Sequence, residues 1–538
     1  MASLEAPPQP GAQAAAQIGK LAEGLFTLGA RLTIAIVVGL LAARLMRRQA
    51  THWGWAALAA LGAYLLRGAF GGLAPAFVLG AGVAAWRGRG SHRHDLDAGA
   101  DLARSARSRR SPPAAARALV ARLGARWGVG ERIRDRGRDE LLLGHGADGR
   151  AISIPFGGST GRHTLVVGAT GSGKTVTQTL MALGAIERGL AAIVVDPKGD
   201  RSLRARLRTA AVLQGLEFLE WTPAGPSIYN PYARGSETEI ADRLLAGERF
   251  TEPHYLRQAQ RYLGHVVRAL RADGGEVTLE AIVRLLDPSS LEELLRRLPQ
   301  AHAGASHGYL DSLTQRQLRD LAGVRDRLAI LTESDVGRWL DPARGGAAGI
   351  DLIRAARSGA VVYFGLESDS RPLLAQMLGA AVVQDLQSTI AALQGDPAPT
   401  LVVIDEFSAV AAEQVVALFG RARSAGFSLL LGTQELSDLR LPGRERLLEQ
   451  ILGNLSVVLA HRQVVPASAE LIAAMGGTRG AWRVSFSSDG RSTRARTREP
   501  LLEPEDLMRL EPGRCVVIGL GAAAGARIAR ITADEGAR

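Results

Sequence analysis

Gly168-Ala169-Thr170-Gly171-Ser172-Gly173-Lys174-Thr175 is the stretch of sequence that decides the fold of this chain. Closely spaced glycines let a backbone wrap around a phosphate, so that its N–H groups and the following helix N-terminus point at the anion. The lysine adds a compact charge for the β- and γ-phosphates, and the threonine hydroxyl is a ligand for Mg²⁺. The spacing predicts a P-loop whose eight residues bind ATP, with Lys174 catalytic and Thr175 holding the metal. A glycine-rich turn before a helix is the plainer alternative.

Lysine is rare in this chain. Only Lys20, Lys174 and Lys198 occur, and the other 62 of the 65 basic residues are arginine. A chain with this bias should keep lysine only where arginine cannot replace it. Because Lys198 follows a strand-like run in Val-Asp-Pro-Lys-Gly-Asp, two of the three lysines lie in candidate nucleotide-site motifs.

The remainder of the chain after the P-loop alternates between short apolar runs and helical stretches. Short apolar or β-branched runs spaced in this way indicate a buried parallel sheet, and hence an α/β fold. The P-loop follows the first run and opens a predicted helix over Lys174–Arg188, which is the context that the motif requires. The strand-like runs are Thr164–Val167, Ala192–Val195, Ala360–Phe364, Leu401–Ile404, Ser428–Leu431, Ser456–Ala460 and Cys515–Ile518.

A second site motif is Leu401-Val402-Val403-Ile404-Asp405-Glu406. Four apolar residues followed by two acids describe a buried strand whose carboxyl end meets the nucleotide. Asp405 is predicted to hold Mg²⁺ through its water shell, and Glu406 to polarise the attacking water. A strand-end turn without this role is the alternative.

Gln434 and Arg423 flank the next strand-like run. Gln434 falls at its carboxyl end, beside Asp405 and Glu406 if the two strands are neighbours, where it would sense the γ-phosphate or position water. Arg423 precedes the run and is expected at a domain edge, where a neighbouring subunit's site would lie. A solvated charge is the plainer interpretation of an arginine at an edge.

Residues 1–90 are predicted to be a membrane anchor of two or three helices. About 20 mainly apolar residues are enough to cross a bilayer, and apolar blocks run over residues 25–46 and from Trp53 to Trp86. Three helices over about 25–45, 53–68 and 70–86 obey the positive-inside rule better, but the second block is short for two. A buried helical hairpin is the alternative to a membrane anchor.

Positive charge is concentrated near the N-terminus. Residues 1–150 carry 21 Lys and Arg against 10 Asp and Glu, which leaves about +1 of the net +12 for the rest. Residues 91–150 are predicted to be a basic juxtamembrane linker that leads into the next domain. This stretch would contact anionic lipid or a nucleic acid. The single cysteine, Cys515, excludes an intramolecular disulfide.

Taken together, these motifs match a known family. The chain resembles the type IV secretion coupling proteins, the TraG/TraD-like conjugative DNA-transfer ATPases of the FtsK/HerA superfamily. The resemblance covers about residues 150–530 and the N-terminal apolar segments. It is carried by Gly168–Thr175, Val195–Asp200, Tyr229–Pro231, Val403–Phe407, Arg423–Gln434, Leu459–Arg462 and Glu503–Leu510.

The resemblance implies a RecA-like P-loop motor domain over 151–234 and 346–538, and an inserted all-α domain over 235–345. It also implies a homo-hexameric ring at the bacterial inner membrane with the motor in the cytoplasm. Its partners would be a type IV secretion channel and DNA, expected as a single strand, with a relaxase or other nucleoprotein. Arg423 would be an arginine finger acting in trans, with Arg462 as second candidate. Residues 483–498 are expected to form a loop or a disordered turn.

The sequence therefore predicts a membrane-anchored ATPase that uses ATP and Mg²⁺ to move DNA or nucleoprotein into a secretion channel. Two alternatives stay open. One is a coupling ATPase for secreted proteins only, and the other is a nucleotide-binding receptor that recruits substrates without pumping them. Stimulation of ATP hydrolysis by single-stranded DNA would distinguish the DNA motor from both.

Overall fold

The computed structural model describes residues 33, 36–37, 40–41, 78–83, 140–146, 149, 151–156, 161–247, 250, 252–342, 349–410, 412–440, 446–486, 492–519 and 525–531. The chain divides into two units, Met1–Ile133 with Trp482–Arg496 and Arg134–Ala481 with Thr497–Arg538. The second unit contains the large sheet. The predicted domain boundaries remain predictions.

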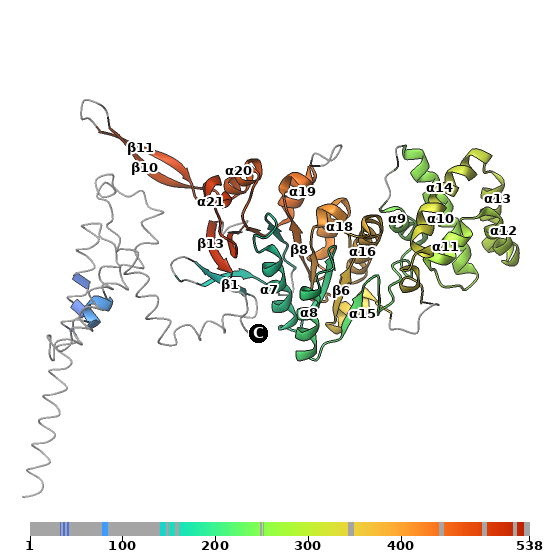
Figure 1. Cartoon of the computed structure of the whole chain (residues 1–538), viewed down its shortest axis with the longest axis horizontal. Coiled ribbons are helices and arrows are strands. Elements are labelled where there is room, and N and C mark those ends of the chain that lie inside the picture. The colour runs from blue at the N-terminus through green and yellow to red at the C-terminus, as the bar shows by residue number, and fades with distance from the viewer. Residues whose placement is uncertain are drawn as a thin grey trace, which may run out of the picture. The chain divides into compact units, whose positions relative to one another are not determined.

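Seven parallel strands form the main part of this sheet (Figure 1). They are β3 (Thr164–Val167), β4 (Ala191–Asp196), β5 (Phe218–Trp221), β6 (Val361–Gly365), β7 (Thr400–Ile404), β8 (Phe427–Thr433) and β9 (Val457–Ala460). Their spatial order is β9-β3-β8-β7-β4-β6-β5. Six of them contain the strand-like runs identified in the sequence, so the predicted parallel sheet is confirmed, and only β5 was missed.

Helices cover both faces of the parallel strands, which explains why the strands are apolar almost throughout. Alternate residues enter two different cores: Leu165 and Val167 pack in one and Val166 in the other. The core around Val166 is closed by α7 (Lys174–Ile186) and α8 (Arg201–Leu213). The opposite core is closed chiefly by α16 (Pro372–Ala392), α18 (Ala412–Ala422) and α19 (Leu447–Asn454).

Four antiparallel strands extend the sheet beyond β9. They are β12 (Arg514–Gly519), β13 (Gly525–Ile531), β1 (Glu140–Gly146) and β2 (Ala151–Pro155), in the order β12-β13-β1-β2. Sequence patterning identified only β12. The others mix buried and exposed residues, as in β13, where Ala529 and Ile531 are buried while Ile528 is 38% exposed. Such one-sided strands lack the continuous apolar run of the parallel strands.

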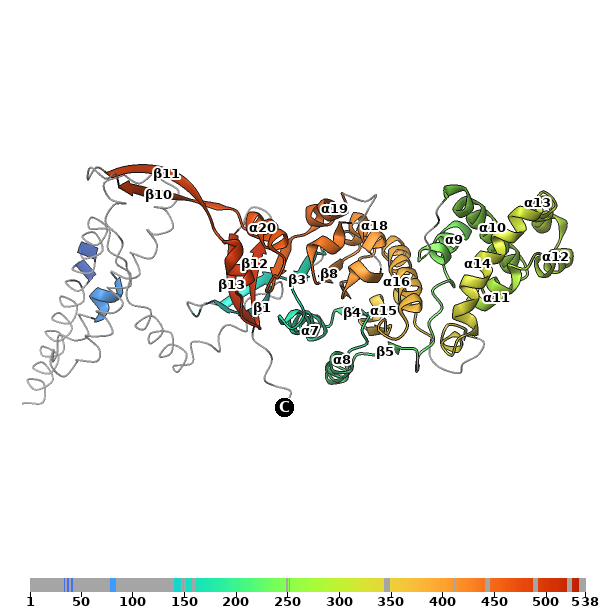
Figure 2. The ribbon, with the colours of Figure 1, turned by 45° about the horizontal axis from the view of Figure 1, so that its top comes forward.

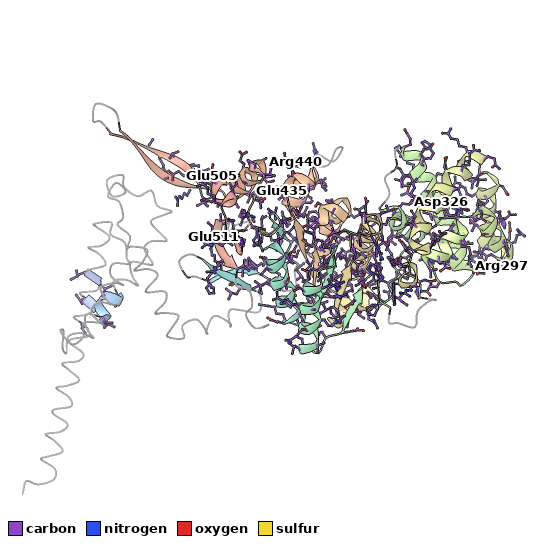
Figure 3. All side chains as sticks on the ribbon, viewed as in Figure 1. Arg297, Asp326, Glu435, Arg440, Glu505 and Glu511 are labelled. Atoms are coloured by element: carbon purple, nitrogen blue, oxygen red, sulfur yellow. The ribbon has the colours of Figure 1, made fainter. Side chains whose placement is uncertain are left out.

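A group of helices is inserted between β5 and β6 (Figure 2). Its members are α9 (Glu237–Leu245), α10 (Pro253–Ala272), α11 (Leu279–Leu285), α12 (Pro288–Arg297), α13 (Gln300–Asp311) and α14 (Gln315–Glu333). The amphipathic stretches of the sequence over Tyr255–Arg271, Leu279–Leu286 and Ser290–Leu298 coincide with α10, α11 and α12. Local signals define several starts: Ser236 and Thr314 form capping boxes, and proline opens α10 and α12. Charged side chains such as Arg297 and Asp326 lie on this insert (Figure 3).

A buried arginine joins the insert to the sheet-bearing part of the unit. Arg243 of α9 is 1% exposed, lies 3.3 Å from the Asp385 carboxylate of α16 and donates to Ser388 at 2.8 Å. Tyr229 donates to the second oxygen of Asp385 at 2.8 Å. Burial raises the pKa of Asp385, and the Arg243 charge and the Tyr229 hydrogen bond oppose this rise. The pair therefore fixes α9 against α16.

The segment from residue 478 to 500 corrects one expectation. Residues 483–498 were expected to be a loop or a disordered turn, but β10 (Thr478–Phe486) and β11 (Ser492–Pro500) pair as a separate two-stranded ribbon. Alternating Arg and Thr in β11 suit an exposed strand, because β-branched residues favour extended backbone. The high content of Ser and Arg in residues 483–498 is typical of loops, and this composition hid the strand pattern in the sequence.

The predicted anchor over residues 1–90 lies mostly outside the described residues. Those described there, 33, 36–37, 40–41 and 78–83, are helical. Among the described residues, no helix combines the length and the apolar character that crossing a bilayer demands. The remaining short elements are α15 (Leu352–Ser358), α17 (Phe407–Val410), α20 (Pro466–Met475), α21 (Pro504–Met508), η3 (Gly337–Trp339) and η5 (Leu436–Leu439).

Candidate active site

The predicted site residues meet at the carboxyl edge of the parallel strands. The P-loop leaves β3, Asp405 and Glu406 follow β7, and Gln434 follows β8. β8 lies between β3 and β7 and runs parallel to both. The expected neighbourhood of Gln434 and the two acids is therefore present, because carboxyl ends of adjacent parallel strands share an edge.

The P-loop has the backbone geometry that its glycines permit. Gly171 and Gly173 adopt positive φ angles of 74° and 107°, which L side chains rarely adopt. A Cβ atom at Gly168 would lie 2.5 Å from the Cβ of His461, so a side chain there would force β9 away. The motif therefore requires glycine at positions 171 and 173 for the backbone conformation, and at position 168 because His461 lies close to it.

The N-terminus of α7 fits an anion. In this described helix, no side chain caps the first turn and no acidic residue lies in it. The Ser172 hydroxyl is buried without a hydrogen-bond partner in the described structure. Free N–H groups, an unpartnered hydroxyl and the nearby Lys174 ammonium form the donor set that a phosphate chain requires.

Glu406 is the centre of the side-chain network. Its Oε1 accepts hydrogen bonds from Lys174 at 2.7 Å, Gln434 at 2.9 Å and Lys198 at 3.2 Å. Burial alone would raise the pKa of Glu406, but the hydrogen bond and charge of Lys174, with help from Gln434 and Lys198, hold it below its ordinary value. Glu406 is thus an anion at neutral pH, held in a backbone with φ of 42°.

Asp405 lies against the P-loop helix. Its Oδ1 accepts a hydrogen bond from Gln178 of α7 at 2.9 Å and lies 4.0 Å from the Lys174 ammonium. Gly432 of β8 passes so close that a Cβ there would lie 2.3 Å from the same oxygen. One turn of α7 thus carries both Lys174 and the amide that orients Asp405. Thr175 lies in that turn, and its hydroxyl with Asp405 is the pair that would hold Mg²⁺.

Gln434 connects Glu406 to the P-loop. Its amide nitrogen donates to Glu406, and its Oε1 accepts a hydrogen bond from the Thr170 hydroxyl at 3.2 Å. Because both ends of the amide are occupied, its orientation is set by the loop and by the carboxylate together. A movement of Thr170 in the P-loop would therefore move the Gln434 amide and change its hydrogen bond to Glu406.

Lys198 is the site residue that the sequence identified only as part of a motif. Asp196, at the end of β4, accepts hydrogen bonds from the backbone N–H groups of Lys198 at 3.0 Å and Asp200 at 2.6 Å, and from Tyr363 at 2.7 Å. Asp200 in turn caps α8. This turn is what delivers the Lys198 side chain to Glu406, so the two aspartates of the motif are structural.

Burial lowers the pKa of His461 to about 4, so its imidazole is neutral. Its Nε2 is 2.9 Å from the Thr177 hydroxyl of α7. The residue follows β9 and was quoted in the sequence only within Leu459–Arg462. It packs the P-loop helix against β9 rather than offering a proton to the site.

The two candidate arginines lie in different places. Arg423 precedes β8 at the amino edge of the sheet, opposite its own P-loop, and donates to the backbone oxygen of Asn454 at 2.8 Å. Arg462 follows β9 at the carboxyl edge, and its backbone oxygen accepts from the Ala169 N–H at 3.0 Å. Arg423 therefore does not join the other predicted site residues, whereas Arg462 lies beside its own P-loop.

Comparison with known families agrees with this geometry. The family described as "TraM recognition site of TraD and TraG" matches residues 399–512, and "Helicase HerA-like C-terminal" matches residues 141–215. The first range contains Asp405, Glu406, Gln434 and the ribbon, and the second contains the P-loop.

Among curated proteins, the chain is 23% identical over 353 residues to the type 4 coupling protein DotL of Legionella pneumophila. That match covers 53% of this chain and 45% of the relative, so the chain spans less than half of that protein's length.

Three solved structures show the same fold. The conjugative coupling protein TrwB without its first 70 residues has a TM-score of 0.55 at 15% identity, covering 75% of this chain and 90% of that one. TrwB solved with ADP and Mg²⁺ has a TM-score of 0.53 at 17% identity, with 70% and 87% covered. VirB4 of Thermoanaerobacter pseudethanolicus has a TM-score of 0.50 at 16% identity, with 73% and 96% covered.

The matched families lie on the two halves of the nucleotide edge, the curated relative is a coupling protein, and the fold is that of TrwB. On these grounds the chain is similar to the TraG/TraD-like type IV coupling proteins of the HerA/FtsK ATPase superfamily, in its two matched segments and in its fold.

Proposed function

We propose that this chain is an ATPase of type IV secretion or conjugation. The observation that carries the proposal is the meeting of Lys174, Asp405, Glu406 and Gln434 beside an uncapped P-loop helix. A bound nucleotide would supply the phosphoryl group, and Mg²⁺ would help to neutralise its charge. Within one subunit, positioning and proton transfer would come from these side chains.

In the proposed cycle, Lys174 changes its partner from Glu406 to the phosphates of the nucleotide, and Glu406 becomes the base. In the structure, the ammonium of Lys174 lies 2.7 Å from the carboxylate of Glu406, and the two charges neutralise each other. In the proposed cycle Lys174 leaves Glu406 for the phosphates, because a phosphate oxygen carries more negative charge than a carboxylate oxygen. Glu406 then accepts a proton from water, while Gln434 orients it.

The proposed coupling function is transfer of DNA, most readily a single strand with its relaxase or another nucleoprotein, into a type IV secretion channel. Support comes from the match to the TraM-recognition family over 399–512 and from the TrwB-like fold. The apolar blocks within residues 1–90 support a membrane anchor at the bacterial inner membrane, with the nucleotide site in the cytoplasm.

We also propose that the chain forms a homo-hexameric ring, in which Arg423 of one subunit acts on the nucleotide bound by its neighbour. The position of Arg423 supports a role in trans, because it lies at the sheet edge opposite its own P-loop. Arg462, beside its own P-loop, suits a role in cis instead.

The alternative is a coupling ATPase or receptor that handles secreted proteins without pumping DNA. The curated relative is named only as a type 4 coupling protein and does not decide between the two.

ATP hydrolysis by the purified full chain, with and without single-stranded DNA, is the test. We expect hydrolysis that single-stranded DNA stimulates and that Lys174→Ala abolishes without unfolding the protein. Hydrolysis that DNA does not change would favour the protein-only alternative. Wild-type hydrolysis by folded Lys174→Ala would contradict the assignment of the P-loop.

A further inference from the structure

The ribbon of β10 and β11 carries a regular row of arginines. Arg494, Arg496 and Arg498 occupy alternate positions of β11, and the described side chains of Arg496 and Arg498 are exposed. Alternate residues of a strand share one face and are spaced about 6.8 Å apart, twice the rise per residue. The exposed guanidinium groups of Arg496 and Arg498 therefore lie on one face of the ribbon, and Arg494 is the next residue in the same alternation of the sequence.

The acidic residue in β11 does not interrupt this row. Glu499 is at an odd-numbered position, on the opposite face, where it lies 4.0 Å from Arg479 of β10. In the sequence, Trp482, Val484 and Phe486 take alternate positions of β10. A positively charged strand face that follows a nucleic-acid backbone, with aromatic residues on which bases stack, is how many proteins bind single strands. The described part of this combination is the exposed pair Arg496 and Arg498.

Backbone contacts connect the base of the ribbon to the P-loop. Leu501 N–H donates to the Gly477 oxygen at 2.9 Å, which closes the ribbon between α20 and α21. The N–H of Gln463 donates to the Leu507 oxygen of α21 at 3.2 Å, and its side chain donates to the His461 oxygen at 2.8 Å.

After α21, the chain reaches the loop itself: Gly513 N–H donates to the Ser172 oxygen at 3.1 Å. The P-loop thus contacts the segment that holds the ribbon at both ends, through Ser172 and Gly513 at one end and through Ala169 and the Arg462 oxygen at the other. These contacts are made by backbone atoms and by the Gln463 side chain, none of which belongs to β10 or β11.

We propose that the ribbon binds the phosphate backbone of a single nucleic-acid strand through the Arg494, Arg496 and Arg498 row, and that its base reports the state of the P-loop. This proposal rests on the proposed DNA-transfer function, because the choice of a nucleic acid as ligand comes from it. An even row of charges suits a linear polyanion, whose phosphates repeat along the chain, better than a lipid surface, whose headgroups are disordered and respond to total charge.

The test compares the full chain with the variant Arg494→Gln, Arg496→Gln, Arg498→Gln. A matched control replaces Arg284, Arg296 and Arg297, exposed residues of α11 and α12, with glutamine. Binding of a fluorescent oligothymidylate is measured by anisotropy at several salt concentrations. Hydrolysis of ATP is measured on the same samples alone, with the oligothymidylate, and with phosphatidylglycerol vesicles.

We expect the ribbon variant to lose on the order of tenfold or more in DNA affinity. The slope of log affinity against log salt should fall by about 2, which is about 0.7 for each of three lost phosphate contacts. Hydrolysis without DNA should stay at the wild-type rate, while its stimulation by DNA is lost. The control should keep wild-type affinity and slope.

Several results would overturn the proposal. One is a ribbon variant with wild-type affinity and slope, and another is an equal loss in the control, which would indicate a general charge effect. A variant that binds DNA normally but loses stimulation of hydrolysis by phosphatidylglycerol vesicles would assign the ribbon to lipid. If the wild type hydrolyses ATP but binds no DNA, both the DNA-transfer function and the proposed ligand of the ribbon are contradicted. If the wild type binds DNA and the ribbon variant binds it equally well, only the role of the ribbon is contradicted.

Discussion

At the scale of single residues, the site in this state is a set of charges that satisfy one another. Glu406 receives three donors on one oxygen, from Lys174, Lys198 and Gln434. An arrangement of this kind keeps a buried carboxylate ionised and positioned before any phosphate arrives, because a buried charge is tolerated only when it is paired and hydrogen-bonded. Substitutions at Glu406 and Lys198 should therefore separate binding from turnover.

Glu406→Gln should bind ATP and Mg²⁺ but hydrolyse ATP about 10²–10⁴-fold more slowly, because the amide keeps the hydrogen-bond acceptor and loses the base. Nucleotide affinity and single-turnover hydrolysis measure the two effects. Glu449→Gln, an exposed position on α19, serves as control. Turnover within a few-fold of wild type would remove Glu406 from the role of base.

Lys198→Met should lower kcat about tenfold, equivalent to ~1.4 kcal/mol in the barrier, with nucleotide affinity nearly unchanged. The reason is that Lys198 is the cation left to hold Glu406 once Lys174 moves to the phosphates, and at 46% exposure its pairing is partly screened. Lys198→Arg should recover part of the rate. A variant that loses affinity as much as kcat would instead make Lys198 a phosphate ligand.

At the scale of elements, the insert depends on a buried ion pair where it joins the sheet. Arg243 of α9 pairs with Asp385 of α16, and their side chains are 1% and 13% exposed. Removing one member leaves the other as an uncompensated buried charge, which costs more than the pair itself contributes.

Arg243→Met should lower the free energy of unfolding by about 3–5 kcal/mol, measured by denaturant titration. Burial already raises the pKa of Asp385, and loss of Arg243 removes a group that lowers it. A raised folded-state pKa adds stability at low pH that is lost as pH rises, so the deficit should be smaller at acidic than at neutral pH. Arg268→Met, which breaks an exposed pair with Glu237, should cost less than about 1 kcal/mol.

At the scale of the whole molecule, the parallel strands gather the catalytic side chains at one edge and leave Arg423 at the other. Within one subunit, Arg423 and the P-loop therefore lie at opposite ends of neighbouring parallel strands. An assembly in which the amino edge of one subunit meets the carboxyl edge of the next would bring Arg423 to the neighbour's P-loop.

Arg423→Ala and Lys174→Ala should each abolish hydrolysis, whereas a mixture of the two should recover part of it. In mixed rings some interfaces pair an intact P-loop with an intact arginine, and such a guanidinium typically contributes about 10³–10⁵-fold in rate. Activity at several mixing ratios is the measurement, with native mass spectrometry to confirm mixed oligomers. If mixed rings form and remain inactive, the trans role of Arg423 is contradicted, and Arg423 acts in cis or structurally.

The sequence by itself determined the P-loop, six of the seven parallel strands and the order of the acids and Gln434. These signals are local: a glycine spacing is needed for backbone geometry, and a strand buried on both faces must be apolar along its length. Lys198 was visible as a motif residue because lysine is otherwise nearly absent.

Only the tertiary structure decided which of these residues touch. The convergence of Lys198, Lys174 and Gln434 on one oxygen of Glu406 depends on strand order, which joins segments more than 200 residues apart. The antiparallel strands and the ribbon also required the structure, because strands exposed on one or both faces have weak apolar patterns. The placement of Arg423 away from the site and of Arg462 beside it follows from strand direction, which no local pattern records.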